Sequence, residues 1–111
     1  MSLGRAVAAL SREVVMLTRS HILKTLRNQK PVLQERFAVR RIGLFGSFAR
    51  GDATPESDID TLVELTSPTF DHYMGLKFYL EELFQTPVDV ILVDSIKPRL
   101  KPYIEAEVVY A

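Results

Sequence analysis

The segment 46–60, GSFARGDATPESDID, places the firmest constraint on how this chain can fold. It follows an apolar run, 39–45, that predicts a β-strand, and a glycine ends that run. Residues 47–50 suit one turn of helix, and residues 51–57 have the composition of a loop. Polar and apolar residues then alternate over 58–65, which predicts a second strand. The sequence therefore predicts a strand, a turn, a loop and a second strand in this region.

The remaining sequence predicts helices around a third strand. Residues 70–84 carry apolar side chains at helical spacing, and the run 88–93, VDVILV, predicts the third strand. Upstream, Ser20 suits a helix N-cap, and we expect the helical segment to break near residues 28–30. We expect a short helical tail that ends at Ala111. The predicted fold class is α/β (α+β), with a small mixed β-sheet covered by helices.

Length and composition favour a single domain without thiolate chemistry. The chain has 111 residues, which suits one domain, and it contains no cysteine. We assign residues 20–111 to that domain and residues 1–19 to an N-terminal extension with helix-like spacing of apolar residues. The 14 basic and 14 acidic side chains cancel, so we do not expect stable nucleic-acid binding. No apolar run has the length of a membrane span and no signal peptide is indicated, so we expect a cytoplasmic protein without a membrane partner.

The first half of the 46–60 motif has the features of a phosphate-binding turn. Gly46 at the end of a strand allows a phosphate to approach the backbone closely. Ser47 begins a helical turn, where free N–H groups attract anions, and its hydroxyl can donate a further hydrogen bond. A plain structural interpretation is also open, in which Gly46 only ends the strand and Ser47 only caps the turn. Arg50 equally suits a surface ion pair with Asp52 or Glu56.

The second half of the motif supplies carboxylates. Asp58 and Asp60 are two residues apart on a predicted strand, so they share one face with Cα atoms about 6–7 Å apart. Two carboxylates at that spacing can bind a divalent cation, and Mg²⁺ prefers such oxygen ligands. Asp89 is the only acid within an otherwise apolar strand and is our candidate for a third carboxylate, which would serve as general base. Asp94, at the end of that strand, is the next candidate.

These motifs together resemble a known family. Residues 39–60, followed by Val88-Asp89-Val90, resemble the nucleotidyltransferase fold of the DNA polymerase beta superfamily. More closely, residues 22–111, including the tail KPRLKPYIEAEVVYA, resemble the minimal nucleotidyltransferases (MNT) that act as antitoxins in HEPN/MNT toxin–antitoxin pairs. Family members bind ATP with magnesium, and some transfer AMP to a tyrosine of the HEPN toxin, a ribonuclease. Thr61 stands where a larger aliphatic residue is common in the family, and we expect no effect on the chemistry.

The resemblance implies roles for individual residues and a partner. Gly46 and Ser47 would hold the nucleotide phosphates, with Arg50 helping to position them. The metal ligands and catalytic carboxylates would be Asp58, Asp60 and Asp89. The function implied is Mg²⁺-dependent transfer of AMP from ATP to a hydroxyl of a HEPN-family toxin. Two other functions stay open: an antitoxin that neutralises its partner by binding alone, and nucleotidyl transfer to a small molecule. Because a chain of this length suits only one domain, we expect a partner protein to supply the acceptor surface.

Overall fold

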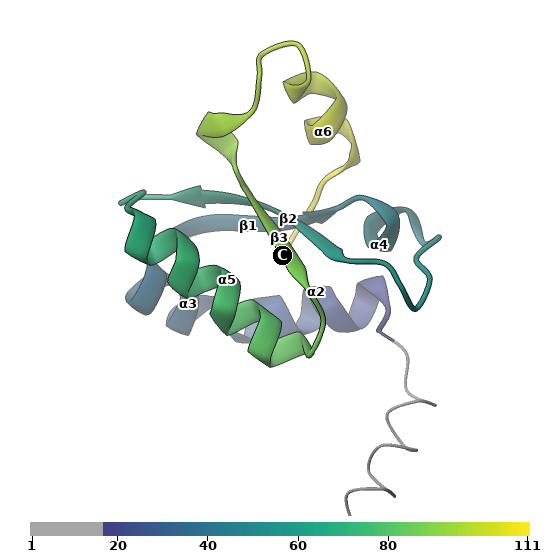
Figure 1. Ribbon diagram of the computed structural model, residues 1–111, viewed down its shortest axis with the longest axis horizontal. Coiled ribbons are helices and arrows are strands. Elements are labelled where there is room, and N and C mark those ends of the chain that lie inside the picture. Colours follow the sequence, from purple (N-terminus) through teal and green to yellow (C-terminus); the bar gives the residue numbers. More distant parts are fainter. Residues whose placement is uncertain (1–16) are drawn as a thin grey trace, which may run out of the picture.

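The computed structural model describes residues 17–111, and Figure 1 shows how they are arranged. In chain order the elements are α2 (Arg19–Asn28), α3 (Lys30–Phe37), β1 (Val39–Phe45), α4 (Ser47–Arg50), β2 (Ile59–Leu65), α5 (Phe70–Phe84), β3 (Val88–Leu92), the 3-10 helix η1 (Val93–Ser95), α6 (Lys101–Glu107) and β4 (Val109–Tyr110). The predicted N-terminal extension lies almost wholly outside the described residues. No helix within 17–111 combines the length and the apolar character needed to span a bilayer.

The four strands form one mixed sheet in the order β3-β2-β1-β4. Strand β1 pairs antiparallel with both β2 and β4, whereas β2 and β3 are parallel. A parallel pair needs a crossover connection, and α5 provides it between β2 and β3. This mixed sheet with its helices confirms the predicted α/β (α+β) fold class.

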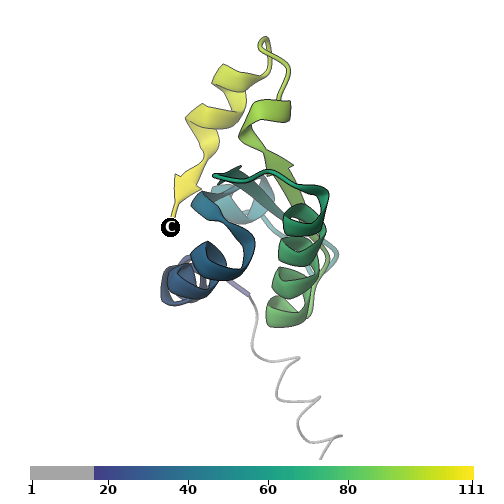
Figure 2. The same ribbon diagram turned by 90° about the vertical axis from the view of Figure 1, so that its left-hand side faces the viewer.

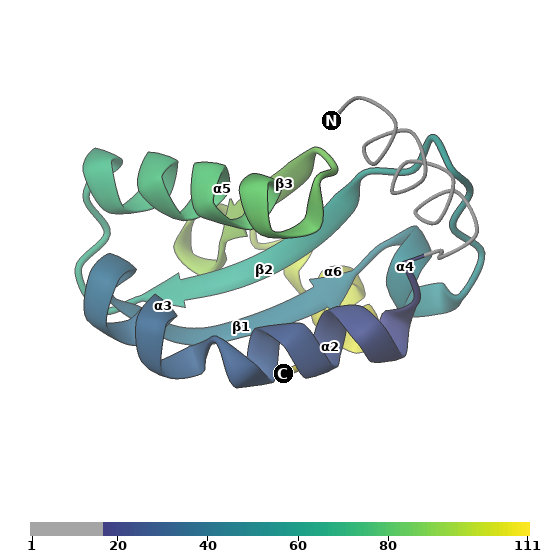
Figure 3. The same cartoon turned by 90° about the horizontal axis from the view of Figure 1, so that it is seen from below.

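Helices α2, α3 and α5 cover one face of the sheet, as the view from below in Figure 3 shows. Alternate strand residues face these helices and are buried in the core, among them Ile42, Ile59 and Val88. On the opposite side stands a projecting arm, defined here as residues 93–107, which contains η1 and α6 (Figures 1 and 2). Because side chains alternate along a strand, Asp60 and Asp89 lie on the arm side of the sheet.

The helical segment before β1 is broken where the sequence indicated. Helix α2 ends at Asn28 and α3 begins at Lys30. The predicted N-cap at Ser20 is wrong, because the cap is Thr18, whose hydroxyl accepts a hydrogen bond of 3.1 Å from the backbone N–H of His21. Threonine and serine can both cap a helix, and the one that lies two residues earlier begins it.

The tail and the third strand differ from the prediction at their ends. Strand β3 stops at Leu92, because Val93 begins η1. The tail contains the short helix α6, but its last residues form β4 rather than helix. Val109 and Tyr110 of β4 pair with Leu44 and Gly43 of β1. β-branched and aromatic residues suit strands, and here the free edge of β1 gives them a pairing partner.

A charged pair fixes the junction between α5 and β3. The ammonium group of Lys77 donates to the Glu81 carboxylate at 3.2 Å and to the Val88 carbonyl at 2.6 Å. The Val88 N–H donates in turn to the same Glu81 carboxylate at 3.0 Å. The Val88 N–H and the Lys77 ammonium lower the pKa of Glu81, so this carboxylate stays charged. The Lys77–Glu81 pair therefore fixes Val88, the first residue of β3, immediately before Asp89.

Candidate active site

The turn after β1 requires a glycine. Gly46 has φ 77° and ψ −154°, a backbone region that is essentially restricted to glycine. A Cβ atom at this position would also overlap the carboxylate of Asp60, whose Cγ would lie only 3.1 Å away. The backbone of Gly46 therefore lies close to an acid of the neighbouring strand, and the approach of a phosphate to it stays a prediction.

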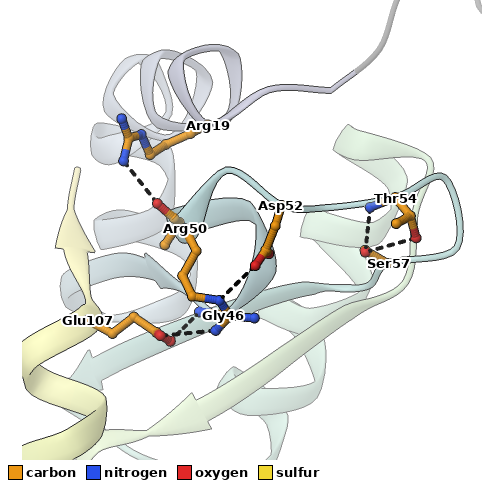
Figure 4. Close-up of polar contacts among 8 residues, drawn as sticks. Arg19, Gly46, Arg50, Asp52, Thr54, Ser57 and Glu107 are labelled. Atoms are coloured by element: carbon orange, nitrogen blue, oxygen red, sulfur yellow. Dashed lines mark hydrogen bonds and ion pairs between the residues drawn. The ribbon is translucent and has the colours of Figure 1, made fainter.

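Ser47 begins α4, the short helix that follows this glycine. Its carbonyl accepts a hydrogen bond of 2.9 Å from the N–H of Gly51, which ends the helix at φ 86°. Arg19 of α2 donates from Nη1 to the Ala49 carbonyl at 2.9 Å, which ties α4 to the helical layer (Figure 4). The predicted turn of helix at residues 47–50 is confirmed, and it holds Ser47 directly beside Gly46.

Asp60 of β2 and Asp89 of β3 are brought together by the sheet. They are register partners across the parallel pair, so their carboxyl groups lie side by side on one face of the sheet. Burial and the neighbouring carboxyl group of Asp89 raise the pKa of Asp60 to about 6. The neighbours Val88 and Val90 are buried, but Asp89 itself is exposed. The cost of burying a charge therefore falls on the half-buried Asp60 and not on Asp89.

Asp58 lies at the end of the preceding loop and is exposed. The strand predicted to begin at Asp58 begins one residue later, at Ile59. The loop before it is closed by a hydrogen bond of 2.8 Å from the Thr54 N–H to the Ser57 hydroxyl (Figure 4). The negative charge of Asp58 also contributes to the raised pKa of Asp60, so the two acids are electrostatically coupled.

Arg50 is already paired with two carboxylates. Its Nε lies 3.2 Å from Asp52 Oδ2, which confirms the surface ion pair with Asp52 that the sequence left open. Its Nη1 lies 3.0 Å from Glu107 Oε2, and Glu107 Oε1 accepts a hydrogen bond of 2.8 Å from the Gly46 N–H (Figure 4). These contacts raise the pKa of Arg50 and lower that of Glu107. The positive charge of Arg50 also opposes the rise in the pKa of Asp60.

Glu107 is the residue of this site that the sequence analysis missed. It is separated from Gly46 by 61 positions, so no local spacing relates the two residues. A weak signal does exist, because Glu107 is an acid in the last turn of a short helix, where the helix dipole disfavours negative charge. Asp94, the alternative third carboxylate, lies exposed in η1 and outside the paired segment of β3.

Thr61 has a structural role that the sequence analysis did not predict. Its side chain is fully buried, and its hydroxyl donates to the backbone carbonyl of Asp89 at 2.8 Å. This hydrogen bond links β2 to β3 at the position of the candidate third carboxylate. A larger aliphatic residue at position 61 would leave that link unmade.

We expect Thr61→Val to lower the free energy of unfolding by about 0.5–1.5 kcal/mol, because it removes a buried hydrogen bond at nearly constant volume. Urea denaturation followed by circular dichroism measures this change. Thr66→Val is the matched control, because the Thr66 hydroxyl is exposed and makes a longer contact of 3.3 Å to the Ala38 carbonyl. A valine variant at position 61 that is as stable as the parent would contradict the proposed link.

The donor chemistry of the three acids fits a divalent cation. Carboxylate oxygens are the ligands that Mg²⁺ prefers, and a cation would relieve the crowding that raises the pKa of Asp60. Asp60 and Asp89 are register partners, whereas the side chains of residues 17–111 do not form a cluster of three or more possible metal ligands.

Comparisons with known proteins agree on a family. A family model described as a nucleotidyltransferase domain matches residues 26–111. The protein adenylyltransferase MntA of Thermococcus cleftensis is 40% identical over 98 residues, which cover 87% of this chain and 99% of that protein. A protein of Methanocaldococcus jannaschii that is provisionally named a protein adenylyltransferase is 42% identical over 99 residues, covering 86% of this chain and 99% of that protein.

Solved structures show the same fold. A structure described provisionally as a minimal nucleotidyltransferase has a TM-score of 0.65 at 33% identity, covering 78% of this chain and 93% of that chain. A complex of a tri-AMPylated HEPN toxin with its MNT antitoxin, from Shewanella oneidensis, matches with a TM-score of 0.53 at 22% identity. That match covers 83% of this chain and 66% of the other, and at this identity it is evidence for the fold alone.

Proposed function

The chain belongs to the nucleotidyltransferase domain family, and from this premise we propose that it transfers AMP from ATP to a hydroxyl group of a partner protein. The observation that carries the proposal is the alignment of Asp60 with Asp89 beside the Gly46-Ser47 turn. A nucleotidyl transfer needs groups that hold the phosphates and carboxylates close to the reacting phosphorus, and the two sets lie side by side here. Relatives that match nearly the full length of this domain carry the name protein adenylyltransferase, which supports AMP as the transferred group.

In this proposal the motif residues divide the work. Gly46 and Ser47 hold the phosphates of ATP, and Arg50 contributes positive charge next to them. Asp58, Asp60 and Asp89 hold Mg²⁺, which when bound neutralises the charge of the phosphates and of the leaving group. Asp89 is the exposed member of the pair on β3 and takes the proton of the acceptor hydroxyl.

The bonds that change are few. The acceptor oxygen forms a bond to the α-phosphorus of ATP, and the bond from that phosphorus to the bridging oxygen of the β-phosphate breaks. Pyrophosphate leaves, AMP remains on the acceptor, and the hydroxyl proton passes to Asp89. The step needs no redox partner, so ATP, the acceptor and the carboxylates account for every atom and charge.

We propose a HEPN-family toxin as the acceptor and a tyrosine as its modified side chain. The name protein adenylyltransferase of the relatives supports a protein acceptor. The resemblance of residues 22–111 to MNT antitoxins supports the choice of toxin and of residue. Modification of the toxin would silence it, which would make this chain its antitoxin.

Radioactive ATP distinguishes this proposal from other phosphoryl chemistry. The purified chain is incubated with Mg²⁺ and a HEPN-family toxin of the same organism, with label in either the α- or the γ-phosphate. We expect the α-label on the toxin, the γ-label only in released pyrophosphate, and an added mass of AMP on a tyrosine peptide. Asp58→Asn/Asp60→Asn is the negative control. Transfer of the γ-label, or labelling that the double variant retains, would refute the assignment.

A further inference from the structure

Glu107 contacts the same groups that bind phosphate in the proposed function. One carboxylate oxygen accepts from the Gly46 N–H at 2.8 Å, and the other lies 3.0 Å from Nη1 of Arg50 (Figure 4). Two oxygens of one anion thus bridge a backbone N–H and a guanidinium group, as two oxygens of a phosphate would. The contact therefore imitates a bound phosphate with a side chain from the arm.

The position of Glu107 in its own helix is unfavourable. It lies in the last turn of α6, where exposed carbonyl groups make the helix end negative. No residue of α6 is buried, so the helix has little packing of its own to stabilise it. Gly46 and Arg50 provide the compensating contacts, and they hold the end of the arm at Glu107 against the turn after β1 (Figure 4).

The backbone beyond Glu107 keeps this carboxylate near the site. Val109 and Tyr110 pair with Leu44 and Gly43 of β1, the strand that leads into Gly46. The side chain of Glu107 can therefore swing away from Gly46 while its backbone stays in place. The Arg50–Glu107 pair also suits exchange, because the two side chains are 49% and 32% exposed and water screens their attraction.

We propose that Glu107 is an internal competitor for the triphosphate, and that ATP binds by displacing its carboxylate from Gly46 and Arg50. This inference rests on the proposed function of the same site. A triphosphate carries more negative charge than one carboxylate and offers more acceptor oxygens, so it can displace the Glu107 carboxylate. Glu107 then sets the affinity for nucleotide and keeps Arg50 neutralised while the site is free of phosphate.

Isothermal titration with Mg²⁺ and a nonhydrolysable ATP analogue tests the competition. Glu107→Gln keeps the shape of the side chain but removes its charge, so we expect the analogue to bind about tenfold more tightly, equivalent to about 1.4 kcal/mol. The affinity for inorganic tripolyphosphate should rise by a similar factor and the affinity for adenosine should not, because only phosphates compete with the Glu107 carboxylate. Glu105→Gln is the matched control, since Glu105 is an exposed acid of the same helix and its change alters the net charge equally.

The possible results distinguish competition by Glu107 from the proposed nucleotidyl transfer itself. Tighter phosphate binding in Glu107→Gln but not in Glu105→Gln supports competition. Unchanged or weaker binding in a folded Glu107→Gln protein overturns it and leaves the nucleotide site intact. If neither the folded parent nor either variant binds the analogue, the proposed function is overturned as well. If Glu107→Gln does not fold, Glu107→Asp replaces it, because the shorter side chain cannot bridge Gly46 and Arg50 and should also strengthen binding.

Discussion

Asp89→Asn should lower the rate of AMP transfer by about 10²- to 10⁴-fold, the usual effect of losing a general base. The asparagine preserves the shape of the side chain but removes its charge and its ability to take the acceptor proton. Binding to the partner should change far less, because an interface extends well beyond one side chain. Incorporation of α-labelled ATP and partner affinity are measured in parallel on the parent protein and the variant.

Asp94→Asn is the matched control for this experiment, because Asp94 is an exposed acid in η1, just beyond the same strand. The Asp94→Asn protein should transfer labelled AMP to the partner at the same rate as the parent protein. If Asp94→Asn loses labelling and Asp89→Asn keeps it, Asp89 is not the third carboxylate. Complete neutralisation of a toxin by a labelling-deficient Asp89→Asn protein would favour an antitoxin that acts by binding alone.

Gly46→Val should abolish measurable nucleotide binding. The backbone at φ 77° and ψ −154° is strained for any side chain, and a Cβ atom there would overlap the Asp60 carboxylate. The turn must therefore shift, and the shift moves both the phosphate-binding N–H groups and one metal-binding acid. Titration with Mg²⁺ and the nonhydrolysable ATP analogue measures the loss, and circular dichroism confirms that the variant is folded.

Gly51→Ala separates the site effect from the general cost of a side chain at positive φ. Gly51 has φ 86° and ψ 14°, but nothing lies within 4 Å of a Cβ atom built on it. Its alanine variant should lose about 1–2 kcal/mol of stability and still bind the analogue. If both variants bound nucleotide like the parent, the phosphate groups would have to be held elsewhere on the protein.

Local signals predicted most of the fold because they depend on neighbouring residues. The strand 39–45, the turn of helix 47–50 and the helix 70–84 match the structure at both ends. Their limits follow from glycine, proline and helix-capping residues, which act within a few positions. β4 was missed because two residues become a strand only when the edge of β1 is available to them.

The site was predictable only in part for the same physical reason. Gly46 and Asp60 belong to one motif, and the sequence placed both on elements that the structure confirms. The contact between Asp60 and Asp89 depends on parallel pairing in register, which alternation within one strand cannot specify. The bridge from Glu107 to Gly46 and Arg50 joins segments that meet only after the sheet has formed.

The neighbouring acids Asp58, Asp60 and Asp89 make the stability of the fold depend on pH and on bound ligand. Asp60 has a pKa of about 6 in the fold against an ordinary value of 3.8. Between these values the folded chain retains a proton that the unfolded chain has lost, so this residue's contribution to stability is lost as pH rises through that interval. At neutral pH the repulsion between the acids remains until a bound cation relieves it, and a ligand that binds only the folded state increases stability with its concentration. Cation-bound nucleotide would thus stabilise the folded state, and its abundance would help determine how much of the protein persists in its native form.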